Sequence, residues 1–156
     1  MGLPRTGQDT SGVREMHQMF QGASSFNEDI GAWDTSGVKS MRWMFRAPAF
    51  NRDIGGWTVD SVTDMDLMFE GASAFNQNIG GWSVGEVTTM LQMFEGCKAF
   101  NQDIGAWDTS GLTSMQRMFR GATAFDQDIG RWALDSVTSL EEMFMDAHSF
   151  DQDIGD

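Results

Sequence analysis

The chain contains one cysteine, two prolines and only ten basic residues among its 156 positions, and it has no long hydrophobic run. A single cysteine excludes an intramolecular disulfide and leaves the redox compartment open. The polar residues 1–12 and the short apolar runs predict neither a signal peptide nor a membrane span. No Asn-x-Ser/Thr sequence occurs, which excludes glycosylation on asparagine.

The scarcity of basic residues leaves a strongly acidic chain. Asp and Glu total 23 against 10 Lys and Arg, so the formal net charge is −13. Such a charge repels phosphate backbones and anionic membrane surfaces, and we therefore expect no nucleic-acid partner. Apolar residues make up 40% of the chain and aromatic residues 12%, which is enough for a buried core.

The most informative feature that is present is an internal repeat. The pair Met-Phe recurs at 19–20, 44–45, 68–69, 93–94, 118–119 and 143–144, so one module of about 25 residues is repeated six times. We predict a polar N-terminal tail over residues 1–12 and a solenoid of about six repeats over residues 13–156, the last of them truncated. Repeat proteins bury a core only by stacking neighbours, which predicts an extended surface rather than an enclosed active site.

Each repeat carries the spacing of an amphipathic helix. Met16, Met19, Phe20 and Ala23 follow an i, i+3, i+4, i+7 pattern, which places all four on one helical face. A hydroxyl residue precedes this pattern and a glycine usually follows it, as expected for helix caps. The glycines are Gly22, Gly71, Gly96 and Gly121. The sequence therefore predicts a helix of about ten residues in each repeat.

The segment after this pattern is short and rich in glycine, as in residues 100–107, and we expect a short strand near its isoleucine. Strands stack about 4.8 Å apart whereas helices need roughly 8–10 Å, so a coil of one strand and one helix should curve with its strands inside. The predicted fold class is α/β: a curved solenoid like a leucine-rich repeat, with one short strand and one short helix per turn of about 25 residues.

The segment FNQDIGAWDTSGLTSMQRMF, residues 100–119, resembles the repeat of BspA-like surface proteins, which are found in mollicute lipoproteins and in marine protists. The resemblance covers nearly the whole chain. It implies a leucine-rich-repeat-like solenoid without catalytic residues that mediates adhesion or protein contact, and it says little about the particular function.

A row of acidic residues occupies one position of the repeat and is interrupted only by Asn78. Its members are Asp29, Asp53, Asp103, Asp128 and Asp153. Carboxylates stacked about 4.8 Å apart repel one another, so each requires compensation. One explanation is local: backbone N–H groups of the following Ile-Gly turn cap each carboxylate. The alternative is a calcium ion held between adjacent repeats.

Three apolar residues stand where other repeats carry polar ones. Trp43, Leu67 and Leu91 lie between or beside the inward methionines of three successive repeats, so they should be neighbours in space. A contiguous apolar patch with a tryptophan is typical of a partner-binding surface. The alternative is that these side chains pack on their neighbours as part of the fold.

The sequence gives little support for catalysis. His17 and His148 stand at opposite ends of the array, and Cys97 replaces an alanine that the other repeats keep. No polar capping repeat is visible, so the ends are expected to stack on another chain or on further repeats. We predict a non-enzymatic scaffold that binds a protein partner and needs no cofactor. The alternatives are a calcium-dependent adhesion module and a structural subunit of a large assembly, perhaps organellar.

Overall fold

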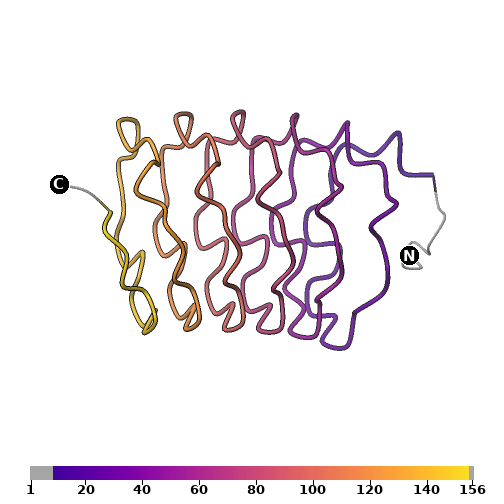
Figure 1. Ribbon diagram of the computed structural model, residues 1–156. Coiled ribbons are helices and arrows are strands. Elements are labelled where there is room, and N and C mark those ends of the chain that lie inside the picture. The colour runs from indigo at the N-terminus through magenta and orange to yellow at the C-terminus, as the bar shows by residue number, and fades with distance from the viewer. Residues whose placement is uncertain (1–8, 155–156) are drawn as a thin grey trace.

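The computed structural model describes residues 9–154, which form a stack of six similar coils (Figure 1). We number the repeats by the residues that occupy equivalent positions in successive coils. Repeats 1 to 6 span 9–33, 34–57, 58–82, 83–107, 108–132 and 133–154. Of the predicted tail, residues 9–12 are described and form part of the first turn, in which Val13 N–H donates to the carbonyl of Thr10 over 2.9 Å.

The predicted helix and strand of each repeat are both wrong. Residues 9–154 contain no helix, and their only β pairing is one isolated parallel bridge between each pair of adjacent repeats. The bridges join Glu15, Ser40, Asp64, Thr89, Ser114 and Ser139 in that order. They lie at the start of the predicted helix, whereas the segment predicted as a strand makes none. The fold is therefore not an α/β solenoid, and without wide helices the reason for expecting curvature disappears.

The spacing of apolar residues that predicted a helix arises instead from two successive β-turns in each repeat. In repeat 3 the N–H of Met68 donates to the carbonyl of Met65 over 3.2 Å, and Leu67 between them has a φ of +53°. The N–H of Ala72 then donates to Phe69 over 2.8 Å, with Gly71 at +72°. A positive φ at the third residue is the pattern of a type II turn. Each turn returns the chain to the interior after three residues, which reproduces the spacing of a helix face.

Hydrogen bonds between repeats take the place of those within a helix. From the bridge residue onward, every second N–H donates to a carbonyl of the next repeat. In repeat 3 these bonds run from Met65 to Thr89 (3.2 Å), Leu67 to Leu91 (2.8 Å), Phe69 to Met93 (3.0 Å) and Gly71 to Glu95 (2.7 Å). Because the same bonds recur along the stack, each repeat depends on its neighbour for its backbone pairing.

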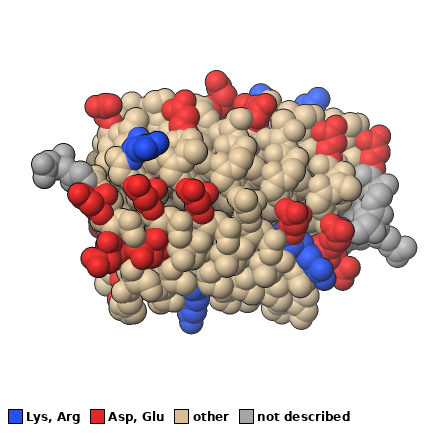
Figure 2. Space-filling model, in the orientation of Figure 1, with Lys and Arg blue, Asp and Glu red and all other residues tan. Residues whose placement is uncertain are grey.

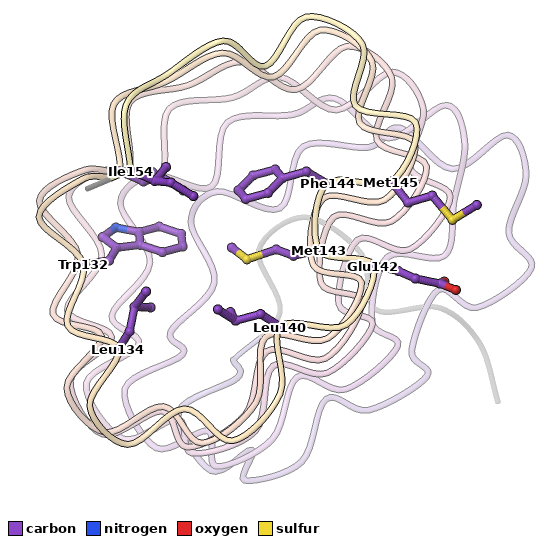
Figure 3. Close-up of a pocket in the computed structure, with 9 residues that line it drawn as sticks. Trp132, Leu134, Leu140, Glu142, Met143, Phe144, Met145 and Ile154 are labelled. Carbon is purple, nitrogen blue, oxygen red and sulfur yellow. The ribbon is translucent and has the colours of Figure 1, made fainter. Parts of the chain in front are cut away.

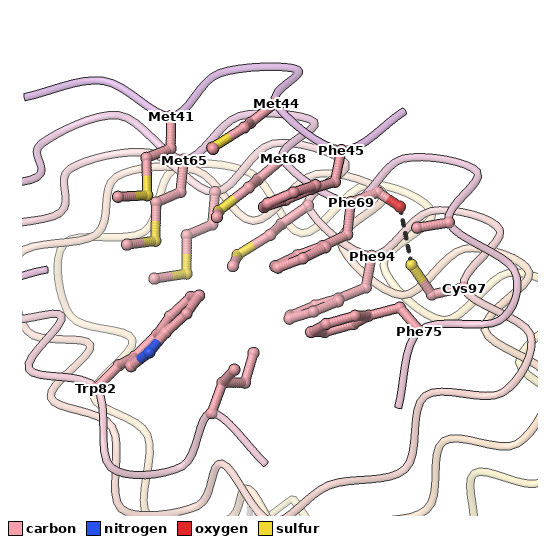
Figure 4. Close-up of a cluster of buried hydrophobic side chains, with 14 of the residues drawn as sticks. Met41, Met44, Phe45, Met65, Met68, Phe69, Phe75, Trp82, Phe94 and Cys97 are labelled. Atoms are coloured by element: carbon pink, nitrogen blue, oxygen red, sulfur yellow. Dashed lines mark hydrogen bonds between the residues drawn. The ribbon is translucent and has the colours of Figure 1, made fainter. Parts of the chain in front are cut away.

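The core is a set of parallel columns in which equivalent residues of successive repeats stack on one another (Figure 4). Phe45, Phe69 and Phe94 stack with ring centroids 5.4 Å and 5.6 Å apart, and the methionines of these repeats form columns beside them. The tryptophan at the end of each of repeats 2 to 5 donates its indole N–H to an isoleucine carbonyl of the preceding repeat, as from Trp82 to Ile54 over 3.3 Å. The described residues include no helix of the length and apolar character that crossing a bilayer requires.

Candidate functional site

Apolar side chains are buried along most of the stack, but several are exposed at the end that repeat 6 forms. Among the described residues the large exposed apolar side chains are Leu134, Leu140, Met145 and Ile154, at 42% to 50% exposure. Leu140 occupies the position that buried methionines hold in other repeats, such as Met65 and Met115. In repeats 2 to 5 the next repeat covers this position, and in repeat 6 nothing within residues 9–154 does. The end is thus a cross-section through the core.

This end surrounds a cavity of about 440 Å³ (Figure 3). Six apolar side chains point into the space that the coil encloses, whereas Glu142 and Met145 point away from it. The six are Trp132, Leu134, Leu140, Met143, Phe144 and Ile154. A concave apolar surface of this kind suits a partner's hydrophobic side chains. We call this surface the open end.

The backbone of the open end also lacks partners. Within the described chain the N–H groups of Leu140, Glu142, Phe144 and Asp146 make no hydrogen bond. The equivalent groups of repeat 5 all donate to repeat 6. They are Met115 (3.2 Å), Arg117 (2.9 Å), Phe119 (2.9 Å) and Gly121 (2.8 Å). The open end therefore combines an apolar cavity with a row of unpaired donors at every second residue, which is the arrangement of a β edge.

The structure brings the three residues of the predicted apolar patch close together. Trp43 and Leu67 occupy the same repeat position, and the N–H of Leu67 donates to the carbonyl of Leu91. Leu67 is buried, whereas Trp43 and Leu91 are half-buried. The guanidinium of Arg42 lies 4.8 Å from the centre of the Trp43 ring and covers part of it. Its role as a binding surface stays a prediction.

The acidic row lies on the surface, where the carboxylates of Asp29, Asp53, Asp103 and Asp128 each accept a hydrogen bond from the glycine two residues later. The N–H of Gly55 donates to Asp53 over 2.9 Å, that of Gly105 to Asp103 over 3.0 Å, and Asn78 accepts from Gly80 in the same way. Asp153 also has an interaction partner. Within residues 9–154 no group of three or more His, Cys, Asp or Glu side chains is placed to hold a metal ion. The observed geometry matches the local capping interpretation. Figure 2 shows acidic side chains outnumbering basic ones on one face.

One buried acid was missed by the sequence analysis. Asp66 occupies the position of Arg42 and Leu91, and its carboxylate accepts hydrogen bonds from the Thr89 hydroxyl and, over 2.9 Å, from the N–H of Leu91. The guanidinium of Arg42 lies 3.2 Å from its other oxygen. Burial nevertheless raises the pKa of Asp66 above its usual range. Only its place in a normally solvated register position signalled anything unusual.

The residues considered for catalysis are not brought together. His17 belongs to repeat 1 and His148 to repeat 6, so the whole stack separates them. Cys97 is buried in the alanine column, and its thiol lies 3.0 Å from the carbonyl oxygen of Phe69 (Figure 4). Burial raises the pKa of the Cys97 thiol, which disfavours the reactive thiolate.

The recurring coils define the chain as a repeat protein. Comparison with known families identifies the repeat family. A family model described as Mycoplasma protein of unknown function, DUF285, matches residues 5–95 and again residues 79–156. The chain belongs to this family, which confirms the resemblance to mollicute-type repeats. No curated protein and no solved structure matches the chain.

Proposed function

We propose that the protein is a non-enzymatic repeat scaffold that mediates protein contact, and that its open end binds a polypeptide segment, which a further repeat or another protein would supply. The observation that carries this proposal is the concentration of exposed large apolar side chains in repeat 6, beside unpaired backbone donors. An apolar surface with a row of free N–H groups is costly to leave in water and well suited to a polypeptide partner. Because the family is described as one of unknown function, the proposal rests on this surface.

A photo-crosslinking amino acid placed at three positions tests the proposal in cells that make the protein. Position 140 lies on the open end, position 43 lies in the predicted side patch, and position 83 is exposed on the wall and serves as the control. We expect protein adducts from position 140 and none from position 83. Adducts from position 43 alone would show that the partner contacts the predicted apolar patch and not the open end. Equal adducts from all three positions would contradict a defined binding surface.

A further inference from the structure

We propose that the outer face of repeat 2 binds an acidic peptide segment in which an apolar side chain stands next to a carboxylate. This site goes beyond the proposed function, because it lies within the stack and away from the open end. It is formed by Arg42, Trp43, Arg46 and Pro48, and we call it the repeat 2 face. Its charge, its tryptophan, its two arginines and a missing residue all set repeat 2 apart from the other repeats.

Repeat 2 carries a net positive charge in an acidic chain. Residues 34–57 include four basic residues and two acidic ones, which gives a formal charge of +2. By the same count repeats 1, 3, 4 and 6 are negative and repeat 5 is neutral. Because an acidic ligand is repelled along most of the stack, repeat 2 is the place where its binding is electrostatically favoured.

Trp43 is the one tryptophan among residues 9–154 that is not buried. The indole N–H groups of repeats 2 to 5 in the core column donate to isoleucine carbonyls, whereas that of Trp43 makes no hydrogen bond within the described chain. The guanidinium of Arg42 lies 4.8 Å from the centre of its ring. A half-buried tryptophan beside arginine is typical of binding hot spots, and it offers a partner both an apolar surface and a free donor.

The two arginines of the repeat 2 face are held by acids of repeat 3. Nη1 of Arg42 lies 3.2 Å from Oδ2 of Asp66, and Nε of Arg46 lies 2.6 Å from Oε2 of Glu70. The arginine side chains are 39% and 53% exposed, against 8% and 21% for the two acids. A partner therefore meets mainly guanidinium N–H groups. Each guanidinium has five such donors, so these contacts leave several of them for a carboxylate.

The two acids have an unfavourable effect on the fold, which indicates a role other than stability. Burial raises the pKa of Asp66 and of Glu70 in spite of their arginine partners. An ion pair of this kind contributes little net stability but restricts the geometry of its members. The pairs therefore preorganise Arg42 and Arg46, which reduces the side-chain entropy that is lost when a ligand binds.

A notch beside Arg46 adds a backbone acceptor. Repeat 2 lacks the glycine of the second turn and is one residue shorter here than the other repeats. In repeat 1 this glycine, Gly22, donates its N–H to the carbonyl of Arg46 over 3.1 Å. The equivalent acceptor for repeat 2 is the carbonyl of Glu70, which receives no hydrogen bond within the described chain. The missing residue leaves a cavity of about 360 Å³, whose lining includes Arg46, Pro48 and Glu70.

The tryptophan and the notch belong to one surface. In repeat 4 the side-chain amide of Gln92, at the position of Trp43, donates to the carboxylate of Glu95, at the position of Arg46. Side chains at these two positions thus meet on the outside of the coil. A carboxylate would pair with the arginines, an apolar side chain would cover Trp43, and a backbone N–H would reach the Glu70 carbonyl. A peptide supplies all three groups, whereas a small carboxylate or phosphate ion supplies only the first.

Selection from a library of short random peptides displayed on phage, against the purified full chain, provides the probes. A parallel selection uses the Trp43→Gln variant, which carries the residue that repeats 1 and 4 hold at this position. We expect peptides that are enriched on the natural chain alone and that place Asp or Glu next to Leu, Ile, Phe or Trp. One such peptide is then synthesised with a fluorescent label, and its binding is measured by anisotropy.

We expect Trp43→Gln and Arg46→Gln each to weaken binding of the labelled peptide at least about tenfold. Arg120→Gln is the matched control. Arg120 stands at the position of Arg46 in repeat 5 and pairs with Glu95 over 3.1 Å, but repeat 5 has no tryptophan on its outer face. This variant loses a comparable ion pair and should bind the peptide normally. Thermal unfolding of all three variants separates a loss of binding from a loss of folding.

Three results would overturn the inference: no peptide enriched on the natural chain over Trp43→Gln, enriched peptides without acidic residues, or equal losses for Arg46→Gln and Arg120→Gln. Peptides whose binding is lost in a Leu140→Asp variant but kept in Trp43→Gln would occupy the open end. That outcome would support the proposed function and contradict a site on the repeat 2 face, so the two proposals can fail separately.

Discussion

In repeats 1 to 5 the glycine of the Ile-Gly pair lies against the backbone of the next repeat. A Cβ added at Gly80 would collide with the carbonyl oxygen of Asp103, and one at Gly55 would stand 2.5 Å from the carbonyl of Asn78. The next residue, Gly81, faces open space. Adjacent glycines in the sequence thus have different roles, and only one of them sets how closely the repeats can approach.

We therefore expect Gly80→Ala to lower the free energy of unfolding by about 1–3 kcal/mol, because the repeats must separate to admit the methyl group. Gly81→Ala is the matched control and should be neutral or stabilise by up to about 1 kcal/mol. Urea unfolding of both variants measures the difference. Equal effects at the two positions would contradict the close contact.

Asp66 gives a prediction that depends on pH. Because burial raises its pKa in the folded state, its ionised form destabilises the fold, and this cost disappears as the pH falls through the folded-state pKa. Asp66→Asn keeps an oxygen for Thr89 and Leu91 but carries no charge. The stability of the variant relative to the natural protein should therefore be higher at about pH 7 than at about pH 4.

Urea unfolding at a series of pH values checks this expectation. The attraction of Arg42 acts only on the ionised carboxylate and is already contained in the net upward shift of the Asp66 pKa, so the informative quantity is how the stability difference changes with pH. A stability difference that does not change with pH would show that the Asp66 carboxyl titrates alike in the folded and unfolded chains.

At the scale of the element, a left-handed residue replaces the middle of the predicted helix. Gln18 has a φ of +57° and is exposed, and its equivalents in the other five repeats also have a positive φ. In a helix, Gln18→Gly would cost about 1 kcal/mol. In the observed turn, relief of the left-handed strain offsets the entropy of glycine, so we expect no loss or a gain of up to about 1 kcal/mol.

Gln21→Gly is the control for this test. Gln21 is also exposed and lies three residues away, but its φ is not positive, so the same substitution should cost about 0.5–1 kcal/mol. Thermal unfolding of both variants compares them. If Gln18→Gly is the more damaging of the two, the left-handed turn is wrong.

The same turn explains how much of the fold the sequence could predict. The repeat, the inward positions such as Met65 and Phe69, and the left-handed glycines such as Gly71 were all predicted correctly. The helix was not, because two β-turns and a helix give the same 3-and-4 spacing of apolar residues. Leu67 and Trp43 also conceal the turn, since residues of these types rarely adopt a positive φ and nothing in their identity indicates it.

The candidate site was predictable only in outline. The missing caps predicted that the ends stack on another chain or on further repeats, but the sequence alone could not show that repeat 6 is open while Met16 and Phe20 of repeat 1 are covered. That difference depends on tertiary packing. The sequence placed the acidic residues at one repeat position, but it could not show that Asp53 and Asp103 accept hydrogen bonds from the backbone of their own turns. Calcium binding by the row stays a prediction.

At the scale of the whole molecule, the stack should be least protected at repeat 6. The N–H groups of Arg117 and Phe119 donate across to the next repeat, whereas those of Glu142 and Phe144, at the same positions, do not. We expect amide hydrogen exchange at Glu142 and Phe144 to be at least about a hundredfold faster than at Arg117 and Phe119. Equal protection at the four positions would mean that repeat 6 is covered in solution.

The recurrence of the same hydrogen bonds between repeats has a genetic consequence. Because successive repeats share the same backbone donors and acceptors and the same apolar columns, an in-frame duplication or deletion of one repeat within the stack would rebuild these shared contacts at the new junction. Only side-chain pairs that belong to one junction, such as Arg42 and Asp66, would be lost. Unequal recombination between the similar coding segments would thus alter the length of the stack and keep its backbone pairing.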